Sequence, residues 1–369
     1  LTVTKIAQNG TAAGSDISVT NTGNLTTSTN PISTTAGANG TISLTATNGA
    51  LTIGSAVTAG GAGVATLTST GGGNDISFSG ANTLTAGSAS LTAGGSVVSG
   101  TAATDIDTSA NNGTITVSAA TSIGAGGNPL EVKPGTGNMS FTANTGGIFA
   151  DLSAGNLLFS KLTTVSAAGA GQTIQLSTGV GNIQIDNVSG LNANTQNDNF
   201  ILTSATTISQ SAALNINAGS LKTTSVGGTT LGSANTIASF NATNSGSGNI
   251  QFTNTAAPLA VTGISQAGGG NVQIDNTGAL TSNTAAIVTG GGNLVLNTSG
   301  TITLTQNVTA GTGTVTLNPS AGGVNQTGGA LTAANLELTG AGTFSLNQAG
   351  NHLTGILAAN ISGVLTYQD

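Results

Sequence analysis

The sequence predicts an all-β fold, a parallel β-solenoid with about three short strands in each rung of about 21–25 residues. Three observations carry this prediction: a motif that recurs at a nearly fixed period, apolar residues that alternate with polar ones, and glycines between the alternating runs. A period of this size is typical of folds in which each repeat is one turn of a stack. We therefore expect a single solenoid over residues 1–369.

The recurring motif is a glycine, an asparagine and two apolar residues separated by one other residue. Its second position is occupied by Asn249, Asn271, Asn293, Thr314 and Asn335, at a nearly constant interval of about 21–22 residues. The apolar residues directly after it are Ile250, Val272, Leu294, Val315 and Leu336. Stacked rungs would align these five side chains in one core column, with adjacent strands about 4.8 Å apart.

Residues 293–317 show one complete rung. Apolar residues alternate with other residues in three short runs, and this period of two indicates strands with one buried face. The apolar pairs are Leu294/Leu296, Ile302/Leu304 and Val315/Leu317. Glycines at the corners between the runs allow a positive φ without a Cβ penalty.

The asparagines of the motif, Asn249, Asn271, Asn293 and Asn335, have two interpretations. They form a ladder in which each side-chain amide bonds to the next, or they are simple turn formers. The sequence leaves both open.

The first half of the chain repeats the same pattern with less regular spacing. Equivalent strand pairs are Ile42/Leu44, Ile115/Val117, Met139/Phe141 and Ile183/Ile185. Two stretches, 151–172 and 189–245, are the least regular, and we expect loops or a flap there. At about 23 residues per rung, the chain would make roughly 16 rungs.

Composition excludes several classes of function. The chain has four lysines, no arginine and a net charge of −7, so it cannot neutralise a run of phosphates, and we expect no nucleic-acid partner. No apolar run approaches the length of roughly 18 residues that a membrane-spanning helix needs, and we expect no membrane span.

The residues of common catalytic and metal sites are scarce. The chain has no cysteine and one histidine, His352, so we expect no enzyme activity, no cofactor and no metal site, and a solvent-facing structural role for His352. Asp105 and Asp107 are spaced to share one face of a strand. Sugar hydrolysis needs such a carboxylate pair, usually with aromatic and basic residues to hold the substrate. These are lacking, and we expect a solvated acidic face.

Two further patterns are less favoured. The segment 71–78 is similar to a calcium-binding nonapeptide, but its Gly and Asp are out of register and it does not repeat. Thr-x-Thr pairs suggest an ice-binding solenoid, yet they are intermittent. The pairs are Thr114/Thr116, Thr301/Thr303 and Thr314/Thr316.

The C-terminal third, in particular residues 324–342 and 351–360, resembles the repeat region of filamentous haemagglutinin-type proteins. These are large exoproteins of Gram-negative two-partner secretion. The resemblance implies a right-handed parallel β-helix, export through an outer-membrane secretion partner, and roles in adhesion, aggregation or biofilm structure. It supplies no catalytic residues, and the family's N-terminal secretion domain is not recognisable in this chain.

We therefore expect a secreted structural or adhesive exoprotein, an adhesin stalk or the subunit of an extracellular filament, outside or on the surface of a Gram-negative bacterium. Its partners would be further copies of itself through end-to-end stacking, a host or neighbouring cell surface, or a polysaccharide. Both ends of the chain read as strands without a polar cap, as in a segment of a longer rod or a stacking protomer. The alternatives are a carbohydrate-binding or carbohydrate-active β-helix and, less favoured, the ice-binding solenoid.

Overall fold

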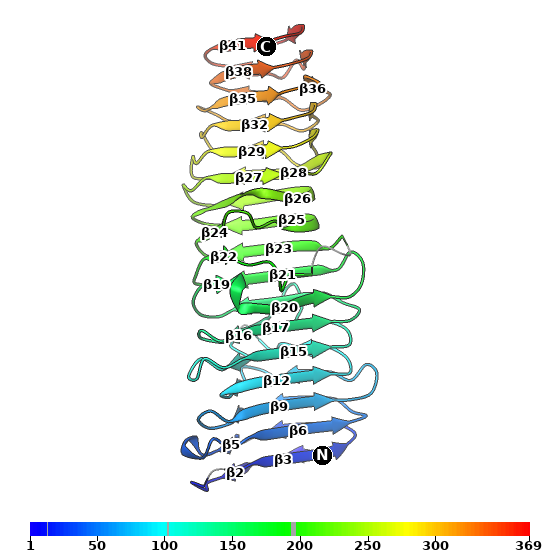
Figure 1. Ribbon diagram of the computed structural model, residues 1–369, viewed down its shortest axis with the longest axis vertical. Helices are drawn as coiled ribbons and strands as arrows, with labels where there is room; N and C mark the ends of the chain where they lie inside the picture. The colour runs from blue at the N-terminus through cyan, green and yellow to red at the C-terminus, as the bar shows by residue number, and fades with distance from the viewer. Residues whose placement is uncertain (13, 102, 193–196) are drawn as a thin grey trace. The chain divides into compact units, whose positions relative to one another are not determined.

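The computed structural model describes residues 1–12, 14–101, 103–192 and 197–369 (Figure 1). Its described residues are nearly all in β-strands or the turns between them, without an α-helix, and these residues make about 16 turns with three parallel sheets per turn. This confirms the predicted fold class and the number of strands per rung. The chain divides into two compact units: unit 1 is Leu1–Gly181 with Ser189–Asp198, and unit 2 is Asn182–Val188 with Asn199–Asp369.

Unit 1 contains three sets of parallel strands, each running from rung to rung. The first sheet is β3 (Ile17–Thr22), β6 (Ile42–Thr47), β9 (Val64–Ser69), β12 (Ser88–Ala93), β15 (Ile115–Ala119), β17 (Met139–Ala143) and β20 (Leu162–Ala167). The second is β1 (Thr2–Val3), β4 (Leu25–Ser28), β7 (Leu51–Gly54), β10 (Ile76–Phe78) and β13 (Val97–Val98). The third is β2 (Ile6–Gln8), β5 (Ile32–Thr34), β8 (Val57–Thr58), β11 (Leu84–Thr85), β14 (Ile106–Asp107), β16 (Leu130–Lys133), β18 (Ile148–Leu152) and β21 (Thr173–Thr178).

Unit 2 repeats the arrangement with more uniform rungs. One sheet is β22 (Ile183–Ile185), β24 (Thr207–Gln210), β26 (Gly228–Asn244), β27 (Ile250–Asn254), β29 (Val272–Asn276), β32 (Leu294–Thr298), β35 (Thr314–Pro319), β38 (Asn335–Gly340) and β41 (Leu357–Ile361). A second series begins with β23 (Asn199–Ser204) and β25 (Asn217–Ser225), which pair with each other, and continues through β26 to β28 (Leu259–Gln266).

Strand β28 pairs with two strands of the next rung, and a separate series of strands follows from each of its two ends. From the first end follow β30 (Leu280–Ser282), β33 (Ile302–Leu304), β36 (Val324–Gln326), β39 (Phe344–Leu346) and β42 (Leu365–Tyr367). From the second end follow β31 (Ile287–Val288), β34 (Val308–Thr309), β37 (Leu331–Ala333) and β40 (His352–Leu353).

The core of each unit consists of columns of inward-facing side chains. In unit 2 the predicted column is present: Ile250, Val272, Leu294, Val315 and Leu336 pair in register and are each at most 1% exposed. Alternate residues of the same strands face outward because successive side chains of a strand point to opposite faces. Phe240 and Phe252 stack beside this column, with ring centroids 4.0 Å apart.

The glycine of the motif has a different role from the one we expected. Gly248, Gly270, Gly292 and Gly313 do not have a positive φ. A Cβ added at Gly292 would overlap with the carbonyl oxygen of Gly270 in the preceding rung, and the other three positions are equally tight. The motif requires glycine because the main chains of adjacent rungs approach closely there.

The two stretches expected to be irregular contain solenoid strands. Residues 151–172 include β19 (Leu157–Leu158), the short 3₁₀ turn η2 (Phe159–Lys161) and β20, where the register with β17 shifts after Met139. Residues 189–245 include β23, β24, β25 and β26, and positions 193–196 of that stretch lie outside the described residues. The other 3₁₀ turn, η1, covers Ala36–Ala38.

Candidate functional site

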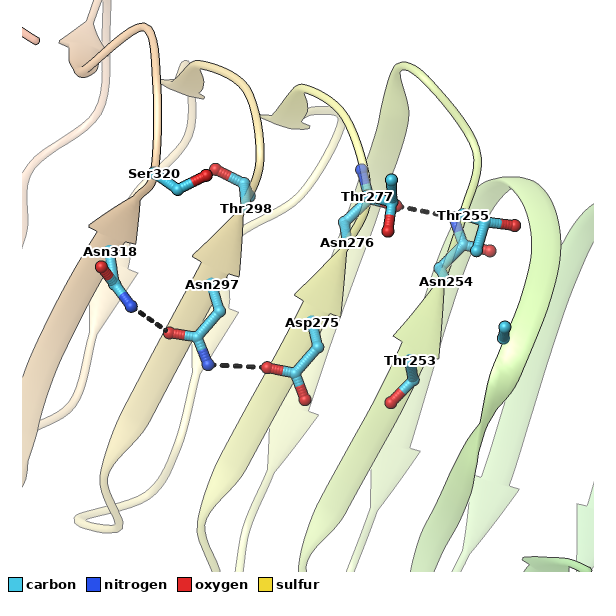
Figure 2. Close-up of a pocket in the computed structure, with 11 residues that line it drawn as sticks. Thr253, Asn254, Thr255, Asp275, Asn276, Thr277, Asn297, Thr298, Asn318 and Ser320 are labelled. Carbon is cyan, nitrogen blue, oxygen red and sulfur yellow. Dashed lines mark hydrogen bonds between the residues drawn. The ribbon is translucent and has the colours of Figure 1, made fainter. Parts of the chain in front are cut away.

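An open groove of about 340 Å³, lined mostly by residues with polar side chains, lies on the outer face of unit 2 (Figure 2). It crosses β27, β29, β32 and β35 near their C-terminal ends. It is lined by Ala234, Thr253, Asn254, Thr255, Asp275, Asn276, Thr277, Asn297, Thr298, Asn318 and Ser320. Asp275 is the one ionisable residue among these.

The register of the sheet places the groove's central side chains in a row. Asp275 pairs with Asn297, which pairs with Asn318 on the next strand. Each lies between buried neighbours in its strand, so its own side chain faces outward. The nearly constant rung length therefore converts a spacing along the sequence into a row of polar groups across the sheet.

These three side chains form a one-way chain of hydrogen bonds (Figure 2). Asn318 Nδ2 donates to Asn297 Oδ1 at 3.1 Å, and Asn297 Nδ2 donates to Asp275 Oδ1 at 2.6 Å. The other carboxylate oxygen of Asp275 accepts from Gln273 Nε2 at 2.8 Å. The row is thus held in one orientation and ends on a charged acceptor, which strengthens the last bond.

Beneath the row, buried amides support the groove. Asn254 Nδ2 donates to Asn276 Oδ1 at 2.9 Å, and Asn276 Nδ2 donates to the carbonyl oxygen of Ala279 at 2.9 Å. Asn254 Oδ1 also accepts from the main-chain N–H of Ile237 at 2.9 Å. Because these amides have partners inside the fold, the floor of the groove is fixed before any ligand arrives.

Other groups in the groove retain free capacity for hydrogen bonds. Among the described residues, the hydroxyls of Thr253, Thr277 and Ser320 have no hydrogen-bond partner, and neither does the side-chain oxygen of Asn318. Sequence reasoning missed this site. A second asparagine at the same place in two successive repeats could have indicated the site. Asn254 follows the motif residue Asn249, and Asn276 follows the motif residue Asn271.

The motif asparagines lie at the opposite end of the same strands from the groove. The main-chain N–H of Asn271 donates to Asn249 Oδ1, that of Asn293 donates to Asn271 Oδ1, and that of Thr314 donates to Asn293 Oδ1, each at 2.9 Å. Asn335 continues the series by accepting from the N–H of Ile356 at 2.9 Å. The asparagines thus connect successive rungs, with a main-chain N–H as the donor rather than the next side-chain amide.

The structure separates Asp105 from Asp107 in unit 1. Asp105 is 2% exposed, and its Oδ2 accepts from the main-chain N–H of Glu131 at 3.1 Å. Glu131 is also buried, and its Oε2 accepts from the Ser99 hydroxyl at 2.9 Å. Burial, with the hydrogen bond between its carboxyl and that of Glu131, raises the pKa of Asp105 to about 7. The expectation of a solvated acidic face was wrong for Asp105, because it lies between rungs against a second carboxyl group.

Asp107 has a separate environment. Its Oδ2 lies 3.0 Å from Lys133 Nζ, and its Oδ1 accepts from the Ser109 hydroxyl at 2.6 Å. Partial burial acts to raise the pKa of Asp107, but the hydrogen bonds from Ser109 and the charge of Lys133 outweigh it and lower the pKa. The two aspartates therefore do not act on one substrate-facing surface.

The remaining candidate residues lie apart from the groove. His352 is exposed, with its Nδ1 3.8 Å from Asp369 Oδ1. Asp75, in the segment similar to a calcium nonapeptide, accepts the main-chain N–H of Ser96 at 2.6 Å. Within the described ranges, no group of three or more His, Cys, Asp or Glu residues is placed to hold a metal ion. No helix in that part of the chain has the length and apolarity needed to cross a bilayer.

The sequence was compared with protein-family models, with curated proteins and with solved structures. None of these comparisons found a match.

Proposed function

We propose that this chain is a structural and adhesive exoprotein, displayed outside or on the surface of a Gram-negative bacterium. It serves as the stalk of an adhesin or as the subunit of an extracellular filament. The resemblance of residues 324–342 and 351–360 to filamentous haemagglutinin-type repeats supports export through an outer-membrane partner. The partners of the displayed surface are further copies of the chain or a neighbouring cell.

The observation that carries this proposal is the uniform stacking of rungs in unit 2. From β27 to β41 each strand pairs in parallel with the next at a nearly constant step of about 21–22 residues. Main-chain hydrogen bonds and a continuous apolar column join every rung to its neighbours. A stack of this kind transmits force along its length, and each added rung extends the same outer surface.

The outer surface fits contact with a cell or with a second copy better than it fits the capture of a charged ligand. Only 4% of the residues are charged, and the outward positions of the strands are mostly Thr, Ser, Asn and Gln. Such a surface forms many weak contacts that sum over repeated rungs, so its affinity depends on multivalency.

Two measurements on the purified chain test the proposal. Negative-stain electron microscopy over a range of concentrations is expected to show filaments if the chain is a filament subunit. Beads coated with the chain are expected to bind Gram-negative cells above beads coated with albumin if it is an adhesin stalk. Particles that stay monomeric at high concentration, together with no bead binding, would overturn the proposal.

A further inference from the structure

We propose that the groove of unit 2 binds an uncharged, extended polysaccharide strand of the β-1,4-linked type, lying along the direction in which the rungs stack. The inference goes beyond the structural and adhesive role and does not depend on it. It rests on the free polar groups of the groove, its nonpolar surface, its open geometry and its charge.

The free polar groups match sugar hydroxyls, which both donate and accept hydrogen bonds. The unpaired hydroxyls of Thr253, Thr277 and Ser320 do both as well. The amide of Asn297 uses one of its two N–H groups on Asp275 and retains the other, and Asn318 Oδ1 is a free acceptor. Because internal hydrogen bonds already orient the row, a ligand would lose little affinity to ordering of the site.

The groove also offers nonpolar surface between its polar groups. Ala234 and the threonines line the groove together with the amides and contribute carbon atoms to its surface. The C–H faces of a pyranose ring pack against such surface while its hydroxyls reach the amides. Without an aromatic side chain in the lining, the affinity for each ring is small, so several rings must bind together.

The open geometry favours a chain over a compact ligand. The groove crosses four successive strands, which lie about 4.8 Å apart, close to the length of one sugar ring in an extended β-1,4-linked chain. Each of these rungs therefore presents one outward polar side chain to successive rings: Thr253, Asp275, Asn297 and Asn318. A coiled α-linked chain does not keep that alignment over several rungs.

The charge of the groove excludes other long ligands. Asp275 is its one charged residue, and no cation lines it, so a polyanion such as a nucleic acid, a polyuronate or a sulfated glycan would be repelled. Both oxygens of Asp275 already accept hydrogen bonds from the protein. The lining also lacks a large apolar side chain to anchor a hydrophobic peptide or an acyl chain.

Isothermal titration of the full chain with cellohexaose tests the proposal, with maltohexaose and hexagalacturonate as the coiled and the charged comparison. We expect cellohexaose to bind with a Kd on the order of 1 mM or tighter and to bind at least tenfold more tightly than either comparison. Asn297→Leu, which fills the groove and removes the central amide, should weaken cellohexaose binding at least tenfold. Thr303→Val is the matched control. It removes an outward hydroxyl of β33 away from the groove and should leave binding unchanged.

If Asn297→Leu does not fold, Thr277→Val removes one free hydroxyl without breaking an internal hydrogen bond, and it should weaken binding about threefold. Circular dichroism of each variant establishes that it is folded. Absence of cellohexaose binding would overturn the proposal. Undiminished binding by the folded groove variants, or tighter binding of hexagalacturonate, would also overturn it.

Discussion

Units 1 and 2 stabilise buried polar groups in different ways. In unit 2 the buried corner residues are amides that pair with one another, as Asn254 does with Asn276 and Gln326 does with Asn351. In unit 1 a buried place between two rungs holds two carboxyl groups, Asp105 and Glu131. An amide both donates and accepts, so it can repeat from rung to rung, whereas two carboxyl groups can pair only if one keeps its proton.

The two units also differ in rung length. In unit 1, the intervals between the successive register partners Ile17, Ile42, Ala65, Ala89 and Ile115 vary from about 23 to about 26 residues. In unit 2 the register partners Ile250, Val272, Leu294, Val315, Leu336 and Leu357 follow one another at intervals of about 21–22 residues, although the earlier step from Ile183 to Ile208 is about 25. Constant rung length keeps like side chains in register, and this is why unit 2 has a repeating ladder and unit 1 has isolated pairs.

The largest effect is expected where the main chains of adjacent rungs meet. Gly292→Val places a Cβ against the carbonyl oxygen of Gly270 and must separate the rungs, which we expect to cost about 3 kcal/mol or more. Chemical denaturation followed by circular dichroism measures this loss. Gly232→Ala is the matched control, since no atom lies within 4 Å of its added Cβ, and a comparable loss there would contradict the account.

A smaller effect is expected from the buried amides of unit 2. Asn276→Leu removes the acceptor of Asn254 Nδ2 and the donor to Ala279, and we expect it to lower the free energy of unfolding by about 2 kcal/mol. Asn293→Ala, at an exposed rung position, should cost at most about 1 kcal/mol. Equal losses of unfolding free energy in the two variants would show that burial does not determine how much these amides contribute to stability.

The carboxyl pair makes the stability of unit 1 depend on pH. The pKa of Asp105 is about 7 in the folded state and about 3.9 in an unfolded chain, so between these values the folded state binds a proton that the unfolded state does not. Stability of unit 1 should therefore fall as pH rises from about 4 to about 7, by on the order of 1–2 kcal/mol, and then level off. The pKa of Asp107 is lowered, so its ionised form stabilises the folded state. This stabilisation is lost only at a pH below the range in which Asp105 titrates, where acid protonates Asp107.

Hydrogen exchange measured by mass spectrometry on peptides that cover 99–133 follows this change within unit 1. Asp105→Asn keeps the shape of the side chain without its titration, and it should remove most of the pH dependence. If the stability of Asp105→Asn still changes with pH as much as that of the wild type, other groups cause the pH dependence.

The smallest effect is expected at the ion pair of Lys133 and Asp107. Both side chains are partly exposed, so Lys133→Met should lower stability by no more than about 0.5–1 kcal/mol. Melting curves at low and high salt measure it, and the difference between wild type and variant should shrink as salt increases. A loss above about 2 kcal/mol that salt does not reduce would show that the pair acts as a buried one.

The sequence allowed the fold and the core column to be predicted because both depend on local rules. Alternation marks the strands, and a fixed period aligns Ile250, Val272 and Leu294 whatever the details of the corners. The same period places Asp275, Asn297 and Asn318 in one outward row, but the groove also depends on the hydrogen bonds between these side chains and on the hollow between strands, which spacing along the sequence does not show. The role of Gly292 was hidden for a related reason, since close approach between rungs is not visible in one strand.

The buried carboxyl pair was missed because its partners are distant along the variable half of the chain. Asp105 and Asp107 suggested a shared face on spacing alone, but Asp105 lies just before β14 rather than within it. Its neighbour Glu131 arrives from the next rung, and the unequal rung lengths of unit 1 conceal that contact in the sequence.

We propose that the stacked rungs carry the function as a displayed surface. The most direct measurement is the settling of bacterial cells that display residues 1–369, compared with cells that display Gly292→Val or Gly232→Ala. We expect the wild type and Gly232→Ala to aggregate cells and Gly292→Val not to do so. Cells that display the wild type and settle no faster than cells without it would contradict the claim.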